Sequence, residues 1–171
     1  KVLMLLRIFK IKNLDFAVYD EKWIHSLRIP SNLNFWKMLS SLKEYKITHA
    51  AISSVVPKLN LIYIESIRNI FHIESFIINH ENSGIKLKVD EPIEVGVDRI
   101  CNTMAAQELI GCPAIIGDIG SATNYDVIDK DGAFIGGAIA PGLETAAKNL
   151  FNKAALLNET TLSMPPSAIG K

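Results

Sequence analysis

The 171-residue sequence has no excess of charge of either sign, because 18 Lys and Arg residues balance 18 Asp and Glu residues. A neutral chain has no electrostatic footprint for nucleic acid or for an anionic membrane, and the composition argues against both as partners. It also has only two cysteines, Cys101 and Cys112, without a pairing pattern. Such sparse cysteine usage favours a reducing, cytoplasmic compartment over a disulfide-stabilised secreted protein.

The sequence also lacks an apolar run long enough to span a bilayer, which takes about 18–20 residues. The opening run Val2–Leu6, with Lys1 and Arg7 beside it, resembles a signal-peptide core. No small-residue cleavage site follows, so a first β-strand is the favoured interpretation. Apolar residues make up 49% of the chain and charged residues 21%, a composition that suits one folded domain or two small ones.

Apolar periodicity and turn residues predict an α/β fold. The first half is expected to form an antiparallel meander of three strands, followed by helices that alternate with further strands of the same sheet. The strands are expected at Val2–Phe9, Asp15–Tyr19, Trp23–Ile29, Thr48–Ser53 and Glu74–Ile78, and the helices at Asn34–Leu42, capped by Ser31 or Asn32, and at Pro57–Phe71, with Leu61, Ile64 and Ile67 on one stripe.

From Ala114 the opening succession of three strands and a helix repeats. The expected elements are the strands Ala114–Gly117, Thr123–Asp129 and Ala133–Ile139 and a helix from Pro141, a residue suited to a first helical position, to about Leu157. Two such units in one chain predict a duplicated α/β architecture, that of the acetate kinase, sugar kinase, Hsc70 and actin superfamily.

The segment Gly96-Val97-Asp98-Arg99 precedes a helix expected at Ile100–Ile110. Asp98 therefore lies near a helix N-terminus, where the dipole favours a carboxylate. Taken alone, the segment is more often a simple helix start beside a solvated arginine. The functional alternative is a carboxylate that accepts a hydrogen bond from a substrate hydroxyl, beside a guanidinium that binds a carboxylate ligand. Cys101, Ala105 and Leu109 fall on one face of this helix, and Gly111 is expected to end it.

Two glycine-containing segments follow. Asp118-Ile119-Gly120-Ser121-Ala122-Thr123 suits either a loop that cradles phosphate and its metal ion or an ordinary hairpin turn. Gly136-Gly137-Ala138-Ile139-Ala140-Pro141-Gly142 allows close backbone approach before a helix N-terminus, although a tightly packed strand-to-helix corner is the more common meaning. The second segment has neither Walker A lysine spacing nor a Rossmann fingerprint.

In their order along the chain, these segments resemble type III pantothenate kinases. The resemblance also rests on the earlier segments Phe16-Ala17-Val18-Tyr19-Asp20, Arg28-Ile29-Pro30 and Ala51-Ile52-Ser53-Ser54-Val55-Val56-Pro57. It covers nearly the whole chain. It implies duplicated ribonuclease H-like (actin-like ATPase) domains with mixed sheets: a first domain over residues 1–112 that carries the acceptor-site segment, and an incomplete second domain over residues 113–171.

The resemblance also implies an activity, the ATP-dependent phosphorylation of the pantothenate 4′-hydroxyl, the first step of coenzyme A biosynthesis. The expected enzyme is a cytoplasmic homodimer that uses Mg²⁺ and a monovalent cation, K⁺ or NH₄⁺. By resemblance, Asp98 is the catalytic aspartate and Asp118 the ligand of the monovalent cation. The pantothenate-binding residues would be Gly96, Val97, Asp98 and Arg99, and Ser121 takes the place of an ATP-contacting threonine.

The sequence departs from the family pattern at several positions. Phe9-Lys10-Ile11-Lys12-Asn13 stands where the family has Asp-x-Gly-Asn-Thr, so the aspartate that helps to place Mg²⁺ is absent, and Ile11 resists the positive φ that the glycine would adopt. Val89 replaces a tyrosine, and Asn124 replaces a second threonine. The chain stops at Ile169-Gly170-Lys171, where the family continues. A fragment, a degraded relative or a frame error in the gene would each explain these departures.

Three interpretations therefore stay open. The intact segment Gly96-Val97-Asp98-Arg99 favours a kinase. The altered stretch Phe9–Asn13 favours weak binding of Mg·ATP and a non-catalytic relative that binds a small molecule or a protein partner in a regulatory role. The third interpretation is a structural fragment without a function of its own.

Overall fold

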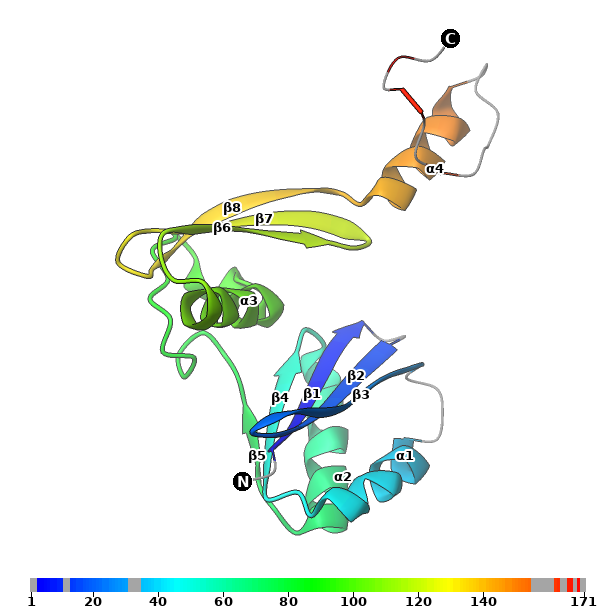
Figure 1. Ribbon diagram of the computed structural model, residues 1–171, viewed down its shortest axis with the longest axis vertical. Helices are drawn as coiled ribbons and strands as arrows, with labels where there is room; N and C mark the ends of the chain where they lie inside the picture. Colours follow the sequence, from blue (N-terminus) through cyan, green and yellow to red (C-terminus); the bar gives the residue numbers. More distant parts are fainter. Residues whose placement is uncertain are drawn as a thin grey trace.

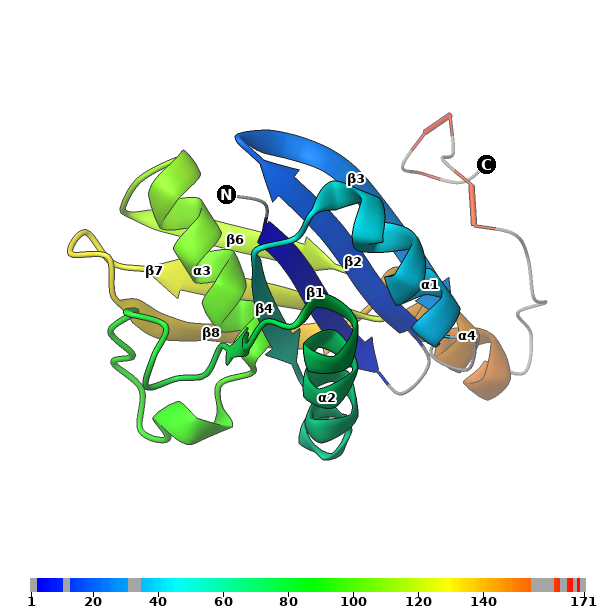
Figure 2. The ribbon, with the colours of Figure 1, turned by 90° about the horizontal axis from the view of Figure 1, so that it is seen from below.

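The computed structural model describes residues 3–10, 13–30, 35–154, 162, 163, 166, 167 and 169. They form two β-sheets with helix α3 between them, and Figures 1 and 2 show this arrangement from two directions. Helices α1 and α2 lie on the first sheet, and α4 follows the last strand of the second. The predicted α/β class is confirmed.

The first sheet has five strands in the order β3-β2-β1-β4-β5. Strands β1 to β3 are antiparallel, and β4 and β5 are added in parallel, as predicted. The strand bounds are β1 Leu3–Lys10, β2 Asn13–Asp20, β3 Lys22–Pro30, β4 His49–Ser54 and β5 Ser75–Ile77.

Alternation along the strands fills the main core. On β2, Leu14, Phe16 and Val18 point inward and are buried, because successive residues of a strand face opposite sides. They pack with Met4, Ile52 and residues of α1 (Phe35–Ser41) and α2 (Asn60–Phe71). Short 3₁₀ turns follow α1 at Leu42–Tyr45 and precede α2 at Pro57–Leu59.

The prediction for the α2 stripe is only partly right. Ile67 is buried and Ile64 packs against the core, but Leu61 is exposed, and Tyr63 and Ser66 are buried in its place. The expected cap of α1 at Ser31 or Asn32 lies outside the described residues.

The second sheet has three antiparallel strands in the order β6-β7-β8. Their bounds are β6 Ala114–Ile119, β7 Ala122–Ile128 and β8 Phe134–Pro141, and α4 spans Leu143–Lys153. The predicted repetition of three strands and a helix is confirmed as an order of elements. Two predicted boundaries are wrong. Asp118 belongs to β6, where it pairs with Asn124, and Pro141 ends β8, where it pairs with Ala122. The part of the expected helix beyond residue 154 lies outside the described residues.

Helix α3 spans Val97–Leu109, so it begins three residues before the predicted start. Gly111 follows it with a positive φ of 96°, the left-handed backbone expected of a glycine helix stop. The apolar stripe noted in the sequence is not the buried face of the helix, since Ala105 and Leu109 are exposed. The buried residues are Val97, Ile100, Thr103 and Ala106. The helix packs on β6, β7 and β4, and the small Thr103 and Ala106 let it approach closely, which side-chain hydrophobicity alone does not indicate.

The segment before α3 is fastened to the second sheet. Leu87 forms a parallel bridge with Phe134, flanked by backbone hydrogen bonds from Lys88 to Phe134 and from Phe134 to Lys86. The Lys88 ammonium lies 2.6 Å from the Asp129 carboxylate, and this hydrogen bond holds the pKa of Asp129 below and the pKa of Lys88 above their ordinary values. Within the described residues, no helix combines the length and apolarity that a bilayer crossing requires.

Candidate active site

The N-terminus of α3 presents Asp98 in its first turn. Asp98 is half-buried, and its Oδ1 accepts the backbone N–H of Arg99 at 2.9 Å, a donor that also reaches the Gly96 carbonyl oxygen at 3.0 Å. The carboxylate thus lies at the helix start, where the helix dipole favours negative charge. Gly96 makes room for this carboxylate, because a Cβ at that position would lie 2.5 Å from Asp98 Oδ1. Val97 is buried in the packed face of α3, so within this segment the polar side chains belong to Asp98 and Arg99.

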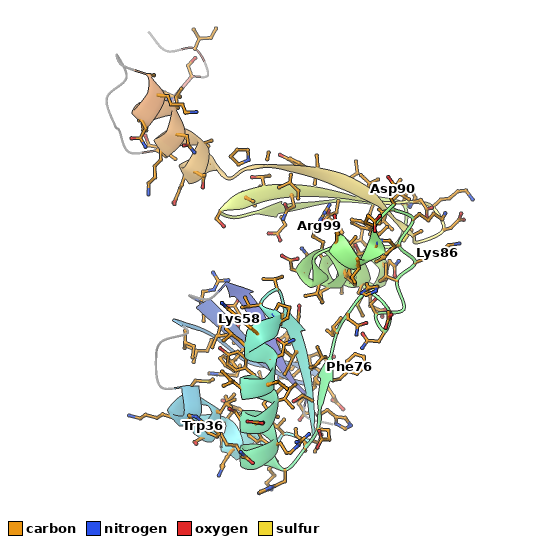
Figure 3. All side chains as sticks on the ribbon, turned by 180° about the vertical axis from the view of Figure 1, so that it is seen from behind. Trp36, Lys58, Phe76, Lys86, Asp90 and Arg99 are labelled. Carbon is orange, nitrogen blue, oxygen red and sulfur yellow. The ribbon has the colours of Figure 1, made fainter. Side chains whose placement is uncertain are left out.

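Arg99 reaches from α3 to the second sheet, where its side chain lies between helix and strands (Figure 3). Its Nε donates to Asp126 Oδ1 at 2.7 Å, and its Nη2 lies 2.5 Å from the same oxygen. The ring of Phe134 lies under the guanidinium, 5.2 Å from Cζ to the ring centre. Asp126 is 0% exposed. The sequence analysis missed this carboxylate, although an acidic residue on the covered face of a strand signals a buried cation partner.

Asp118 faces α3 from β6. Its Oδ2 accepts a hydrogen bond from Asn102 Nδ2 at 3.1 Å. Asn102 comes four residues after Asp98, so both lie on the same face of the helix, about 6 Å apart along its axis. Helix α3 therefore brings the Asp98 and Asp118 carboxylates to one side of the molecule. Asn102 is a second residue that the sequence analysis did not identify, because a mid-helix asparagine has no motif of its own.

The turn between β6 and β7 is held against the start of α4. The Ser121 carbonyl accepts the Gly142 N–H and the Thr145 hydroxyl, both at 3.1 Å. A Cβ at Gly142 would lie 2.0 Å from the Gly120 carbonyl oxygen, so only glycine fits there. The close backbone approach expected of the Gly136–Gly142 segment is thus made to the chain itself, which confirms the tightly packed corner.

A Cβ at Gly137 would likewise lie 1.9 Å from the Tyr125 carbonyl oxygen. Gly137 pairs with Asp126 across the β7–β8 ladder, so this second close approach lies beside the Arg99 ion pair.

The predicted metal ligand Asp118 lies among the described residues, and its role stays a prediction. In the described portion of the chain, no group of three His, Cys, Asp or Glu side chains could hold a metal ion. Asp118 alone supplies one carboxylate, fewer protein ligands than a cation cage built from side chains requires. The altered stretch Phe9–Asn13 lies at the junction of β1 and β2, and Ile11 and Lys12 fall outside the described residues.

A cavity of about 890 Å³ opens between the β2–β3 hairpin and α3. Cys101 and Met104 line it from the helix, and Asp15 and Arg28 line it from the strands. The last two form a two-pronged ion pair with distances of 2.6 and 2.8 Å. Cys101 comes three residues after Asp98, so the cavity begins one helical turn from that carboxylate. Its volume suits a small organic molecule.

Comparisons with known proteins agree with the resemblance seen in the sequence. A family described as type III pantothenate kinase matches residues 13–171. A type III pantothenate kinase of Thermomicrobium roseum is 41% identical over 153 residues, which is 89% of this chain and 56% of the relative. A second, from Roseiflexus sp., is 42% identical over 134 residues, 78% of this chain and 52% of the relative. The chain therefore spans about half the length of these curated relatives.

Among solved structures, a Campylobacter jejuni protein described as a Baf family transcriptional activator matches with a TM-score of 0.56 and 23% identity, over 98% of this chain and 68% of that one. At this identity the likeness concerns the fold alone.

Proposed function

Because the chain belongs to the type III pantothenate kinase family, we propose that its protein transfers the γ-phosphoryl group of ATP to the 4′-hydroxyl of pantothenate. This is the first step of coenzyme A biosynthesis. The proposed acceptor site comprises Gly96, Val97, Asp98 and Arg99, with Asp98 as the catalytic residue. Asp118 is proposed as the ligand of a monovalent cation, and Ser121 as an ATP contact.

The observation that carries the proposal is the shared face of α3. Asp98 lies one turn from Asn102, and Asn102 is hydrogen-bonded to Asp118. Phosphoryl transfer needs a group that orients the attacking hydroxyl and, within a few ångströms, positive charge near the phosphate. In this proposal Asp98 orients the hydroxyl, and a cation bound at Asp118 would supply the positive charge near the phosphate.

In this mechanism, Asp98 accepts a hydrogen bond from the 4′-hydroxyl of pantothenate. This hydrogen bond orients the hydroxyl oxygen toward the γ-phosphorus of ATP. A bond forms between this oxygen and phosphorus as the bond to the leaving ADP oxygen breaks, and the proton passes late to Asp98. A carboxylate is a weak base for an alcohol, so Asp98 chiefly orients the hydroxyl before the transfer. Arg99 binds the pantothenate carboxylate. A cation at Asp118 offsets phosphate charge when it is bound.

Further features of the proposal concern the fold and the setting. We propose duplicated ribonuclease H-like domains over residues 1–112 and 113–171, which the repeated order of strands and helix supports. A phosphate contact near Ser121 is proposed because the β6–β7 turn lies beside the start of α4, where the N–H groups of the first turn beyond Gly142 favour an anion. A homodimer, Mg²⁺ and K⁺ or NH₄⁺ come with the family. A chain with only two cysteines and no pairing pattern supports a cytoplasmic setting.

Steady-state kinetics of the chain with ATP, pantothenate, Mg²⁺ and K⁺ tests the assignment. Asp98→Asn is expected to lower kcat by about 10²–10⁴-fold with little effect on pantothenate binding, because an amide keeps the shape but cannot take the proton. Arg99→Ala is expected to raise KM instead, because a carboxylate clamp acts in ground state and transition state alike. Asp90→Asn, an exposed carboxylate in the preceding segment, is the matched control. Near-normal kcat in Asp98→Asn would leave Asp98 as a helix-start residue only.

The second candidate function is a non-catalytic relative that binds a small molecule or a protein in a regulatory role. It is favoured by Phe9 and Ile11, which stand where the family has an aspartate and a glycine. It predicts pantothenate binding without turnover and weak binding of Mg·ATP by calorimetry. A sub-micromolar Kd for Mg·ATP would contradict this alternative.

A further inference from the structure

We propose that Asp126 is a positioning residue for Arg99: its buried carboxylate fixes the guanidinium in the direction that receives the carboxylate of the acceptor. The inference rests on the proposed function, which makes Arg99 the clamp for that carboxylate. Asp126 touches no substrate in this account and acts only through Arg99.

The contact geometry fixes one edge of the guanidinium. Nε and Nη2 both lie on Asp126 Oδ1, at 2.7 and 2.5 Å. Arginine carries five N–H donors in a rigid fork, so the edge that faces Asp126 leaves other donors for a ligand. The Arg99 side chain is 17% exposed, which is enough for one edge of the plane to meet a bound anion.

Two further residues of the second sheet contact or adjoin the Arg99 guanidinium. Phe134 covers one face of the guanidinium, and such stacking limits its rotation. Gly137 pairs with Asp126 across the β7–β8 ladder, and a Cβ there would lie 3.0 Å from Arg99 Nη2. The sheet therefore holds the guanidinium with the Asp126 carboxylate and the Phe134 ring, and Gly137 leaves room for it because it has no side chain.

Stability alone is a poor explanation of this pair. Asp126 Oδ2 is buried and has no hydrogen-bond partner among the described residues. An unpaired buried oxygen weakens an ion pair as a source of stability, and apolar replacements of buried pairs are often neutral or better. The arrangement instead fixes the direction of the Arg99 guanidinium. Arg99 lies in the first turn of α3, next to Asp98.

Calorimetry with two ligands tests the inference: pantothenate, and its alcohol analogue in which CH₂OH replaces the carboxylate. We expect the 171-residue chain to prefer the acid, and Asp126→Asn to lower that preference by about tenfold, the size of one charge-assisted contact. Arg99→Ala should abolish it, and Arg99→Ala/Asp126→Asn should lose no more than Arg99→Ala alone, because the second change acts through the first. Asp131→Asn, an exposed carboxylate on the β7–β8 turn, is the control.

A spectroscopic readout separates positioning from folding. In ¹⁵N-labelled chain, the Arg99 Nε–H signal, assigned by its loss in Arg99→Ala, should be protected from exchange and should lose that protection in Asp126→Asn. Thermal unfolding of each variant is followed in parallel. If Asp126→Asn does not fold, Phe134→Leu keeps the carboxylate and removes the ring, and the preference should fall by about two- to threefold.

The outcomes are distinct. A folded Asp126→Asn chain that keeps the full preference for the acid overturns the inference and leaves the proposed function standing, as does an unchanged preference in folded Phe134→Leu. If the wild-type chain binds acid and alcohol equally, or binds neither, Arg99 is not a clamp for the carboxylate. That result overturns the positioning role of Asp126 together with the proposed acceptor site. A reduced preference together with a deprotected Nε–H supports the inference.

Discussion

The two sheets differ in how their faces are covered. The five-stranded sheet buries its inward side chains under α1 and α2, and its core residues are almost fully hidden. The β6–β8 sheet packs α3 against one face and leaves large apolar side chains exposed on strands β6 and β8, namely Ile115, Ile119, Ile135 and Ile139. Stability is therefore expected to reside in the first region.

The candidate chemistry lies in the second region. Asp118, Asp126 and Ser121 belong to it, and Asp98 and Arg99 face it from α3. These residues are held by the Arg99–Asp126 ion pair, by the hydrogen bond from Asn102 to Asp118 and by close glycine contacts. Only a few apolar side chains, such as Ile100, Ile128 and Phe134, are buried with them. The candidate site is thus held mainly by polar contacts of defined direction, and only a small apolar core lies beside it.

The largest expected difference between the regions is in the response to the same truncation. Ile52→Ala in β4, where the side chain is 0% exposed, should lower the free energy of unfolding by about 2–5 kcal/mol. Ile115→Ala in β6, 74% exposed, should change it by no more than about 0.5 kcal/mol. Urea unfolding of the two variants measures both. Equal losses would mean that the exposed face of β6 is covered in solution.

The next comparison concerns two strand glycines of the second sheet. Gly137→Ala should lower the free energy of unfolding by about 1–3 kcal/mol, because its methyl group meets the Tyr125 carbonyl oxygen and the Arg99 guanidinium. Gly117→Ala has no heavy atom within 4 Å of the added Cβ and serves as the control. Denaturant midpoints of both variants decide the point. If Gly137→Ala is as stable as Gly117→Ala, the strands are not held at the close approach described.

The smallest expected effect is a pH response. The pKa of Asp129 is held low by its hydrogen bonds to Lys88 and to the backbone N–H of Ala133, and that of Glu74, in the first region, by its hydrogen bond to Arg68. A lowered folded-state pKa stabilises the protein above the ordinary value, 3.8 for Asp129 and 4.5 for Glu74, and this contribution disappears as pH falls through the folded pKa.

Melting temperatures taken from about pH 6 down to pH 2 should therefore fall less steeply in Asp129→Asn and Glu74→Gln than in wild type. The change should be larger for Asp129→Asn, since Asp129 also accepts the backbone N–H groups of Asp131 and Ala133 at 2.9 and 2.8 Å. Identical slopes in the two variants would show that these backbone bonds add nothing to the ion pair.

The sequence predicts the elements better than their contacts. The strands of both sheets, the repeated meander and the stop at Gly111 follow from alternation, turn residues and backbone freedom, which are local properties. The buried face of α3 does not, because both sheets pack against that helix and its buried residues include the polar Thr103 and the small Ala106. Asp98 and Asp118 are recognisable as candidates because they belong to motifs.

The partners of the candidate residues are a different matter. The roles of Asp126 on β7 and of Asn102 on α3 follow only from the folded contacts of α3 with β7 and β6, since their partners Arg99 and Asp118 lie 27 and 16 positions away. The assignment of a catalytic role to Asp98 and of cation binding to Asp118 stays a prediction, which the variants above test.

The open edge of β6 has a consequence for handling the protein. Strand β6 is the outer strand of its sheet, and its sequence Ala-Ile-Ile-Gly-Asp-Ile carries one charge and two exposed isoleucines. Among the described residues β6 pairs only with β7, and an edge strand of this kind can pair with a strand of another molecule. With a formal net charge of zero at pH 7 and an isoelectric point near 7.1, the chains do not repel one another at neutral pH. Colloidal stability is therefore lowest at physiological pH, and dilute, mildly alkaline buffer keeps the chains apart.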